Sequence, residues 1–333
     1  MALRIGIAGA TGAVGQEALH LLEAGSLPIS EIRLFASARS AGRRLSFRQD
    51  PVPVEEISVG RLSGLDYLFL SAGSSVSRQY APVAVKGGAV VIDNSSAFRM
   101  VDDVPLVVPE VNAKALNRHS GIIANPNCTA AILATAVWPL HQAAVIERIV
   151  VATYQAASGA GAKALFELDA QVRQYAAGET IRKEVFPEQI AFNVFSHNTP
   201  VDDSGFNEEE NKVAQEIRKI FGEPNLGVCP TCIRVPVFRA HSEAVVLETR
   251  RKLSAEDARE ILRHAPGVEV VDDRQANRFP TPLDAAGKRE ILVGRLREDP
   301  SHPRALALFV SGDQLLKGAA WNAIQILERL AAG

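Results

Sequence analysis

The chain has 333 residues, enough for about two domains of ordinary size. Hydrophobic residues make up 47%, charged residues 22% and the net charge is -2, so the composition is that of a globular protein and gives no reason to expect nucleic acid or an anionic membrane as a partner. Three cysteines are too few for a disulfide scaffold, no apolar run is long enough to span a membrane, and the N-terminus lacks the apolar stretch of a signal peptide, so we expect a cytoplasmic protein.

A glycine-rich segment follows the first predicted strand. Residues 3–8 have strand character, Gly9-Ala10-Thr11-Gly12-Ala13-Val14-Gly15 follows, and apolar residues at 18–22 then recur with helical spacing. Glycines between a strand and a helix allow the tight turn, the close approach of backbone to a pyrophosphate and the helix packing that dinucleotide binding needs. Bare N–H groups at the helix start then bind the phosphate charge. We therefore predict cofactor contacts from Gly9, Thr11, Gly12, Ala13, Val14 and Gly15.

The end of the second predicted strand, residues 32–35, carries no acidic residue. An NAD site would place Asp or Glu here, about 20 residues past the glycines, to bind the ribose hydroxyls. The segment instead contains small hydroxyl residues and arginines, among them Ser37, Arg39 and Ser40. A guanidinium pairs with phosphate in a bidentate manner, so this loop favours the 2′-phosphate of NADP(H) over NAD. A solvated basic turn would have the same composition.

Two further buried strands are predicted at residues 67–70 and 89–92. Each is followed by a polar segment, and cofactor contacts gather at the carboxyl ends of strands in open α/β sheets. Ser71 and Gly73, in a loop expected to run to Ser77, are therefore candidates for cofactor binding. Arg99, after the second strand, is either a clamp for a substrate anion or a surface charge. The alternating units predict a doubly wound sheet.

Asn125-Pro126-Asn127-Cys128 lies between a short β-branched strand and a long alanine-rich segment that we predict to be a buried helix. Cys128 then occupies the first turn of that helix. Unpaired N–H groups and the positive end of the helix dipole favour a thiolate there, and the thiolate is the nucleophilic form. A buried cysteine that only fills space would occupy the same pattern.

The second half of the chain changes character. A β-branched strand at 145–154 leads into the small-residue loop 155–161, and Asn207 precedes an acid-rich helix start. Further strands at 245–249, 291–295 and 306–310 predict a mostly antiparallel sheet, and residues 315–326 predict a closing helix.

Cys229 and Cys232 form a C-x-x-C pair, which invites a zinc or redox interpretation. A zinc site needs a complete ligand set at recognisable spacings, and the chain has no second cysteine pair, so we expect inert cysteines in a strand and no metal. His241 is either a core histidine or a general acid/base, and the presence of a candidate thiolate and a cofactor loop makes the second plausible.

Taken together, these motifs resemble the bacterial type of aspartate-semialdehyde dehydrogenase in the right order and over essentially the whole chain. The most specific are Asn125 to Cys128 and the segment Arg234 to Ser242. The others are 9–15, 37–42, 95–100, 155–159, 186–193 and 317–320.

The resemblance implies an α/β fold: an N-terminal Rossmann-like dinucleotide-binding domain plus an α+β catalytic and dimerisation domain with a mostly antiparallel sheet. The first would span 1–128 plus 314–333, and the second 129–313. The closing helix would return to the first domain and bring Asn322 near the nicotinamide. The assembly implied is a homodimer, or two dimers paired into a tetramer.

The resemblance also implies the reaction: reversible NADPH-dependent reduction of β-aspartyl phosphate to aspartate β-semialdehyde, with release of phosphate, in lysine, threonine and methionine biosynthesis. Cys128 would be the nucleophile, His241 the acid/base and Gln155 the residue that positions the acyl group. The substrate and phosphate set would be Arg99, Asn127, Glu209, Lys212 and Arg234. Ser158 and Gly159 would join the cofactor contacts.

Three points stay open. Glu208, Glu209 and Glu210 are consecutive, and Glu209 is chosen because the Glu-Glu-x-Lys spacing fits best. A reductase of another acyl phosphate, such as N-acetylglutamyl phosphate, is the nearest alternative, although a carboxylate and a guanidinium together favour a free amino acid. A non-catalytic paralogue would be expected to lack Cys128, His241 or Arg234, and all three are present.

Overall fold

The computed structural model describes residues 2–332, and contacts divide them into two compact units. Unit 1 contains the residues up to Asn127 and those from Ala319 onward, and unit 2 is Cys128–Gly318. The boundaries expected from the sequence are 129 and 313. Unit 2 begins one residue before the first of these and ends five residues after the second. Gln314 belongs to unit 2, where its side chain accepts a hydrogen bond from Ala240 N at 2.8 Å.

Unit 1 is built around a seven-stranded sheet. Its strands are β1 (Leu3–Ala8), β2 (Ile29–Ala36), β3 (Arg44–Phe47), β4 (Asp50–Glu56), β5 (Tyr67–Leu70), β6 (Val90–Asp93) and β7 (Ile122–Ala124). Its helices are α1 (Ala13–Ala24), η1 (Val59–Arg61), α2 (Ser74–Lys86), α3 (Pro109–Asn112), η2 (Ala113–Arg118) and α9 (Trp321–Ala331). The strand order is β3-β4-β2-β1-β5-β6-β7, and every pair except β3–β4 is parallel.

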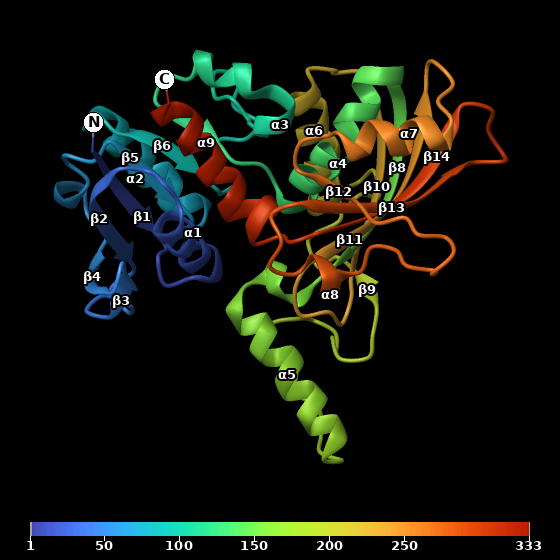
Figure 1. The fold of residues 1–333 in the computed structure, drawn as a ribbon. Helices are drawn as coiled ribbons and strands as arrows, with labels where there is room; N and C mark the ends of the chain where they lie inside the picture. The colour runs from blue at the N-terminus through green and yellow to red at the C-terminus, as the bar shows by residue number, and fades with distance from the viewer. Residues whose placement is uncertain (1, 333) are drawn as a thin grey trace. The chain divides into compact units, whose positions relative to one another are not determined.

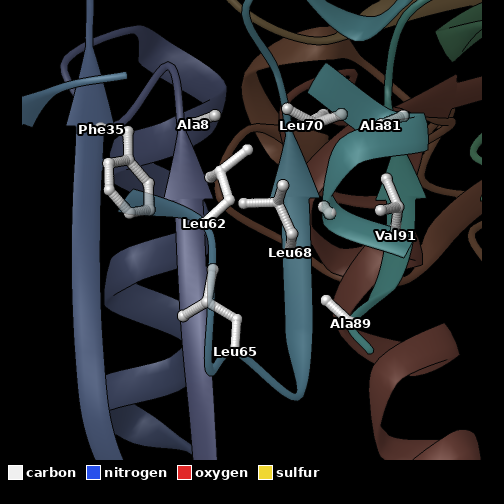
Figure 2. Packing of buried hydrophobic residues seen from close by; sticks show 10 residues of the cluster. Ala8, Phe35, Leu62, Leu65, Leu68, Leu70, Ala81, Ala89 and Val91 are labelled. Carbon is white, nitrogen blue, oxygen red and sulfur yellow. The ribbon is translucent and has the colours of Figure 1, made fainter. Parts of the chain in front are cut away.

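This order reverses direction at β1, which has β2 on one side and β5 on the other. The carboxyl ends of β1 and β5 thus frame the crevice where doubly wound sheets bind their ligands. Apolar side chains beside these strands form a buried core that includes Phe35, Leu62, Leu68 and Val91 (Figure 2). Burial of these side chains holds the strand ends in place beneath the crevice.

Unit 2 contains a second seven-stranded sheet. Its strands are β8 (Ile146–Gln155), β9 (Phe195–Ser196), β10 (Gly227–Arg234), β11 (His241–Thr249), β12 (Val268–Val270), β13 (Ile291–Glu298) and β14 (Ala305–Gly312). Its helices are α4 (Cys128–Ala144), η3 (Ala157–Ala160), α5 (Ala162–Ala176), α6 (Glu208–Phe221), α7 (Ala255–Arg263) and α8 (Pro282–Ala285), and a π-helical turn, η4 (Leu316–Ala320), leads out of the unit.

The strand order is β12-β13-β14-β11-β8-β10-β9, and antiparallel pairs outnumber the two parallel ones, β8–β10 and β12–β13. Helices α4, α6 and α7 pack against strands of the sheet. Helix α4 is buried from Thr129 to Val137 on all sides, as its alanine-rich sequence requires. Helix α5 extends away from the sheet (Figure 1).

These observations confirm the predicted fold class, a parallel Rossmann-like sheet followed by a mostly antiparallel one. Two local expectations are wrong. The polar loop after β5 ends earlier than Ser77, because α2 begins at Ser74 with Gly73 as its N-cap. The closing helix starts as the π turn η4 and becomes α-helical only at Trp321. No helix within residues 2–332 combines the length and apolar composition needed to cross a bilayer.

Candidate active site

The glycine segment of unit 1 lies at the crevice between β1 and β5. Gly9 follows β1 with a φ of +85°, and a Cβ on it would lie 2.2 Å from the carbonyl oxygen of Ser71, which follows β5. A Cβ on Gly15 would lie 2.3 Å from the Gly9 carbonyl oxygen. Both positions therefore require glycine. Helix α1 begins at Ala13 without a side-chain cap from Gly12, so its first N–H groups face no capping side chain. This cradle fits a dinucleotide pyrophosphate.

The loop after β2 lies at the same carboxyl edge of the sheet. A turn closes it, with Ser40 N donating to Ser37 O at 2.9 Å. Arg39, Arg43 and Arg44 are exposed. Gly73, at the start of α2, has a φ of +91° with open space beside it. The predicted cofactor residues of unit 1 before residue 100 thus share one edge.

The segment before Cys128 is fixed by amide groups. Asn125 donates to Asn94 Oδ1 at 2.7 Å, and Asn322 donates to Asn125 Oδ1 at 2.7 Å and to Val107 O at 2.9 Å. Arg99 is buried, and it donates to the carbonyl oxygens of Asn125 and Asn94, both at 2.9 Å. The Asn322 amide therefore orients the Asn-Pro-Asn segment, and the Arg99 guanidinium is anchored at the ends of β6 and β7.

In unit 2, Cys128 and His241 face each other. Cys128 is the first residue of α4 and His241 the first of β11, and Cys128 Sγ lies 3.4 Å from His241 Nε2. Ala156 N donates to His241 Nδ1 at 3.1 Å, so the neutral imidazole carries its proton on Nε2, toward the sulfur. Burial, and the positive charge of Arg234, lower the pKa of His241 well below its usual value. The ring is therefore neutral at neutral pH.

Gln155, the last residue of β8, connects two other polar side chains. Its amide nitrogen donates to Glu209 Oε1 at 3.1 Å, and its amide oxygen accepts from Thr153 Oγ1 at 3.0 Å. All three residues are buried. The network orients the Gln155 amide, with its nitrogen turned toward the start of α6.

The three consecutive glutamates have different partners. Glu210 completes a capping box with Asn207, both bonds being 2.9 Å, and also accepts from Cys232 N. Glu208 pairs with Lys212 at 2.5 Å on the surface of α6. Glu209 alone of the three bonds to Gln155. The geometry therefore separates a helix cap, a surface ion pair and a carboxylate beside the candidate catalytic residues.

Arg234 ends β10, where the parallel register places it beside Gln155. Its Nη1 donates to Ala156 O at 3.3 Å and its Nη2 to His197 Nε2 at 2.7 Å. Arg234 is buried, with only 5% of its surface exposed, and its Nε has no hydrogen-bond partner among residues 2–332. A buried guanidinium with an unpaired donor is suited to an anionic ligand.

Gly159 lies between these groups. A Cβ on it would lie 3.1 Å from Arg234 Nη1 and 3.1 Å from His241 Cε1. Gly318, at the end of unit 2, similarly passes Cys128, since a Cβ there would lie 2.8 Å from Cys128 Cβ. The absence of side chains at both positions leaves room around the sulfur and the guanidinium. Ser158 accepts a hydrogen bond from Gln314.

Comparison with known proteins decides the family. The model of the semialdehyde dehydrogenase NAD-binding domain matches residues 4–119, and that of the semialdehyde dehydrogenase dimerisation domain matches residues 137–317. An aspartate-semialdehyde dehydrogenase of Synechocystis sp. is 50% identical over 328 residues, covering 98% of this chain and 97% of the relative. The chain belongs to the aspartate-semialdehyde dehydrogenase family. It is accordingly an oxidoreductase with a dinucleotide-binding domain.

Two solved structures are similar along their full length. Aspartate-semialdehyde dehydrogenase II from Vibrio cholerae, complexed with ASA, is 42% identical with a TM-score of 0.96, covering 100% of this chain and 99% of that one. The enzyme from Candida albicans, with NADP, is 25% identical with a TM-score of 0.78 and the same coverage. The fold of this chain is therefore similar to that of both structures over their full length.

Three residues near the candidate catalytic site were not predicted from the sequence. His197, Thr199 and Gln314 contact the candidate catalytic residues or their neighbours, yet no pattern in their local sequence marks them. Their placement depends on the pairing of the two-residue strand β9 with β10, and on the loop after β14. Only long-range pairing could have found them.

The C-x-x-C pair lies within β10. Cys229 is exposed and Cys232 is buried, because residues three apart on a strand face opposite sides. Burial raises the pKa of the Cys232 thiol beyond the usual range. Among the described residues, no group of three or more His, Cys, Asp or Glu side chains is arranged to hold a metal ion.

Proposed function

We propose that this enzyme catalyses the reversible, NADPH-dependent reduction of β-aspartyl phosphate to aspartate β-semialdehyde and phosphate. The observation that carries the proposal is the Cys128–His241 pair, with Sγ and Nε2 3.4 Å apart, in the same unit as a buried guanidinium that has an unpaired donor. A nucleophile, its proton-bearing partner and an anion receptor are what acyl transfer from an amino-acid acyl phosphate needs.

Cys128 is the nucleophile in this proposal. Its thiolate attacks the acyl carbon, a C–S bond forms, the C–O bond to phosphate breaks, and the products are a thioester and inorganic phosphate. The start of α4 and the Nε2–H of His241 stabilise the negative sulfur. The same Nε2–H then faces the oxygen that becomes negative in the tetrahedral intermediate. In these steps His241 thus acts from Nε2, as the hydrogen-bond donor to the sulfur and then to the oxyanion.

When bound, the cofactor would supply the hydride that reduces the thioester carbon. Gly9, Thr11, Gly12, Ala13, Val14, Gly15, Ser71 and Gly73 would hold it at the edge of the parallel sheet, with Ser158 and Gly159 contributing from unit 2. After reduction the oxyanion expels the Cys128 thiolate, which restores the enzyme and releases the aldehyde. No step requires a metal ion.

Substrate charges would be recognised by two residues of unit 2. Arg234 would bind the α-carboxylate through its open donors, and Glu209 would bind the α-ammonium. Gln155, held by Thr153 and Glu209, would position the acyl group. Arg99, Asn127 and Lys212 would bind the departing phosphate. The carboxylate of Glu209 favours a free amine over the acylated amine of N-acetylglutamyl phosphate, because an amide offers no charge to pair with a buried carboxylate.

We propose NADP rather than NAD as the cofactor. The loop after β2 carries Ser37, Arg39 and Ser40 and exposes its arginines, and a guanidinium suits a 2′-phosphate. The relative from Candida albicans has NADP in its structure, which supports the choice. We also propose a cytoplasmic location, which the three free cysteines support.

A homodimer is the proposed assembly, with unit 2 as its interface. The match to a dimerisation domain supports it. Helix α5 and the loop after it also expose large apolar side chains: Phe166 is 73%, Tyr175 62% and Phe192 62% exposed. Tyr175 and Phe192 adjoin, with ring centroids 4.7 Å apart, and adjoining exposed apolar side chains are typical of surfaces that a partner covers. Sedimentation at micromolar concentration should give twice the chain mass of 35.7 kDa, and a monomeric mass would contradict the proposal.

A spectrophotometric assay tests the proposed reaction. Aspartate semialdehyde, NADP⁺ and phosphate should give NADPH, the rate should depend on phosphate, and Cys128→Ser should reduce it by at least about a thousandfold, since a serine hydroxyl is far less ionised than a thiol. Cys229→Ser, which changes an exposed cysteine of the same unit, is the control and should keep full activity. NADPH formation without phosphate, or substantial activity in Cys128→Ser, would refute the mechanism.

A further inference from the structure

His197 is a buried histidine that the proposed reaction leaves without a role. It follows β9, and its backbone N–H donates to Cys232 O at 2.8 Å, which continues the β9–β10 pairing. The side chain is 7% exposed. Its Nε2 lies 2.7 Å from Arg234 Nη2, and its Nδ1 lies 3.2 Å from Thr199 Oγ1.

These contacts define the protonation of the ring. A guanidinium can only donate, so His197 Nε2 must be the acceptor, and the ring proton is on Nδ1, which donates to Thr199 Oγ1. Burial, and then the positive charge of Arg234, lower the pKa of His197 to about 4. Lys212 acts in the same direction, whereas Glu209 and Glu208 oppose it. The neutral acceptor is therefore the form present under physiological conditions.

The contacts continue to the other charged residue of the site. Thr199 Oγ1 also accepts from the backbone N–H of Glu209 at 3.2 Å. That N–H belongs to the first turn of α6. The Glu209 side chain in turn accepts from Gln155, which is paired in register with Arg234. Arg234 and Glu209 are thus connected by hydrogen bonds through His197 and Thr199 on one side, and through Gln155 and the β8–β10 strand register on the other.

We propose that His197, acting through Thr199, is a positioning residue that fixes Arg234 relative to Glu209 and so sets the selectivity for a substrate carrying both an α-carboxylate and an α-ammonium. The inference rests on the proposed roles of Arg234 and Glu209. A guanidinium held by His197 and by the Ala156 carbonyl presents its remaining donors in one orientation. Without His197 the guanidinium would gain rotational freedom, and part of the binding free energy of the carboxylate would be spent on ordering it.

The test compares three aldehydes in wild-type enzyme, His197→Ala, His197→Gln and Arg234→Leu. Aspartate semialdehyde carries both charges, 3-aminopropanal lacks the α-carboxylate and succinic semialdehyde lacks the α-ammonium. In His197→Ala the KM for aspartate semialdehyde should rise about tenfold while kcat changes less than about threefold, because a uniform binding interaction is weakened. The kcat/KM for 3-aminopropanal should change less than about twofold, since it has no group for Arg234 to hold.

The conservative variant separates positioning from a structural role. The Oε1 of glutamine occupies nearly the place of Nε2 and can accept from Arg234, so His197→Gln should recover most of the selectivity. Thr199→Val keeps the volume but removes the acceptor for His197 and Glu209, and should lower selectivity in the same direction by a smaller factor. His141→Gln is the matched control: His141 is buried in the same unit against Trp138 and Phe221. It should change stability but not selectivity.

The outcomes are distinguishable. If His197→Ala lowers kcat/KM for all three aldehydes by the same factor, or leaves the KM for aspartate semialdehyde unchanged while Arg234→Leu raises it, the inference fails and the proposed function stands. If wild-type enzyme does not turn over aspartate semialdehyde, or Arg234→Leu leaves its KM unchanged, the proposed substrate recognition fails and this inference with it.

Discussion

In unit 1 the predicted nucleotide site is formed by backbone, whereas in unit 2 the candidate catalytic site is formed by side chains. Gly9 and Gly15 contribute by having no Cβ, at places where one would lie 2.2 Å and 2.3 Å from a carbonyl oxygen. In unit 2, groups from the last residues of β8 and β10 and from the starts of β11, α4 and α6 meet through hydrogen bonds.

Because of this difference, we expect the two sites to respond differently to amino-acid substitution. A backbone site depends on a few glycines, so replacing one should abolish binding without affecting chemistry elsewhere. A side-chain site is a network in which each group is oriented by others, so a change at one member alters several kinetic parameters in proportion to its contacts. Substitutions in the two units should therefore have separable effects.

Among the glycine substitutions, the largest effect is expected from Gly9→Ala in unit 1. The new Cβ would meet the Ser71 carbonyl at 2.2 Å, and the φ of +85° is unfavourable for alanine. NADPH binding, measured by fluorescence titration, should weaken by more than about a hundredfold. Alkylation of Cys128 by iodoacetamide should keep its rate, because Cys128 belongs to unit 2.

Gly64→Ala is the matched control for this substitution. Gly64 has a φ of +78°, but its nearest neighbour, Arg4 Nη1, would be at an ordinary 3.5 Å from a Cβ. It should cost about 1 kcal/mol of stability and leave NADPH binding intact. Equal loss of binding in both variants would mean that backbone strain, and not close approach at the crevice, explains the effect.

A smaller effect, mainly on kcat/KM, is expected from Gly159→Ala in unit 2. A Cβ there would lie 3.1 Å from both Arg234 Nη1 and His241 Cε1, so one of these groups must shift by a few tenths of an ångström. We expect kcat/KM to fall by about tenfold to a hundredfold, because such displacements impair an oriented site. Steady-state kinetics should show this loss, and the NADPH dissociation constant should rise by a smaller factor, because Gly159 is only one of several proposed cofactor contacts. If the Gly159→Ala variant binds NADPH poorly but keeps kcat, the distinction drawn here between the sites of unit 1 and unit 2 is wrong.

Glu243 offers a test that concerns stability and not binding or catalysis. Its side chain is fully buried on β11, two residues from His241, and neither carboxyl oxygen has a hydrogen-bond partner within residues 2–332. Burial raises the pKa of this carboxyl well above its usual value. The folded protein therefore keeps a proton that the unfolded chain loses above about pH 4.5, and stability declines as pH rises from there toward the folded pKa.

Glu243→Gln should remove this dependence, because an amide stays neutral at every pH. Denaturant unfolding should find the variant more stable than wild type at pH 8, with the difference shrinking to zero near pH 4.5 at a slope of at most about 1.4 kcal/mol for each pH unit. A difference that does not vary with pH would mean that Glu243 is not the protonated group we infer.

Much of the fold could be predicted because its signals are local. The strand before Gly9, the helix after Gly15 and the alanine-rich segment after Cys128 all have the periodicity of the elements they form. The helix start at Ser74 was missed because Gly73 caps it through backbone geometry alone. The strand β9, only two residues long, was missed because its formation depends on pairing with β10.

The site residues also divide into those that a local motif predicts and those that only their surroundings identify. Cys128, Gln155, Glu209, Arg234 and His241 belong to motifs, and sequence reasoning could name them before knowing that they meet in unit 2. The Glu-Glu-x-Lys spacing favoured Glu209 over its two neighbours, but the physical difference among the three depends on Asn207 and Gln155 as partners. Sequence reasoning missed His197, because a buried histidine is recognised only by what surrounds it.

The most direct test of the account is to identify the acyl-enzyme. Enzyme mixed with NADP⁺ and aspartate semialdehyde in the absence of phosphate, quenched in acid and digested, should yield a peptide containing Cys128 with the added mass of an aspartyl thioester. Phosphate added before the quench should remove the adduct, because it is the acceptor in that direction. An enzyme that turns over fully but carries no adduct, or carries it on another residue, would contradict the central role of Cys128.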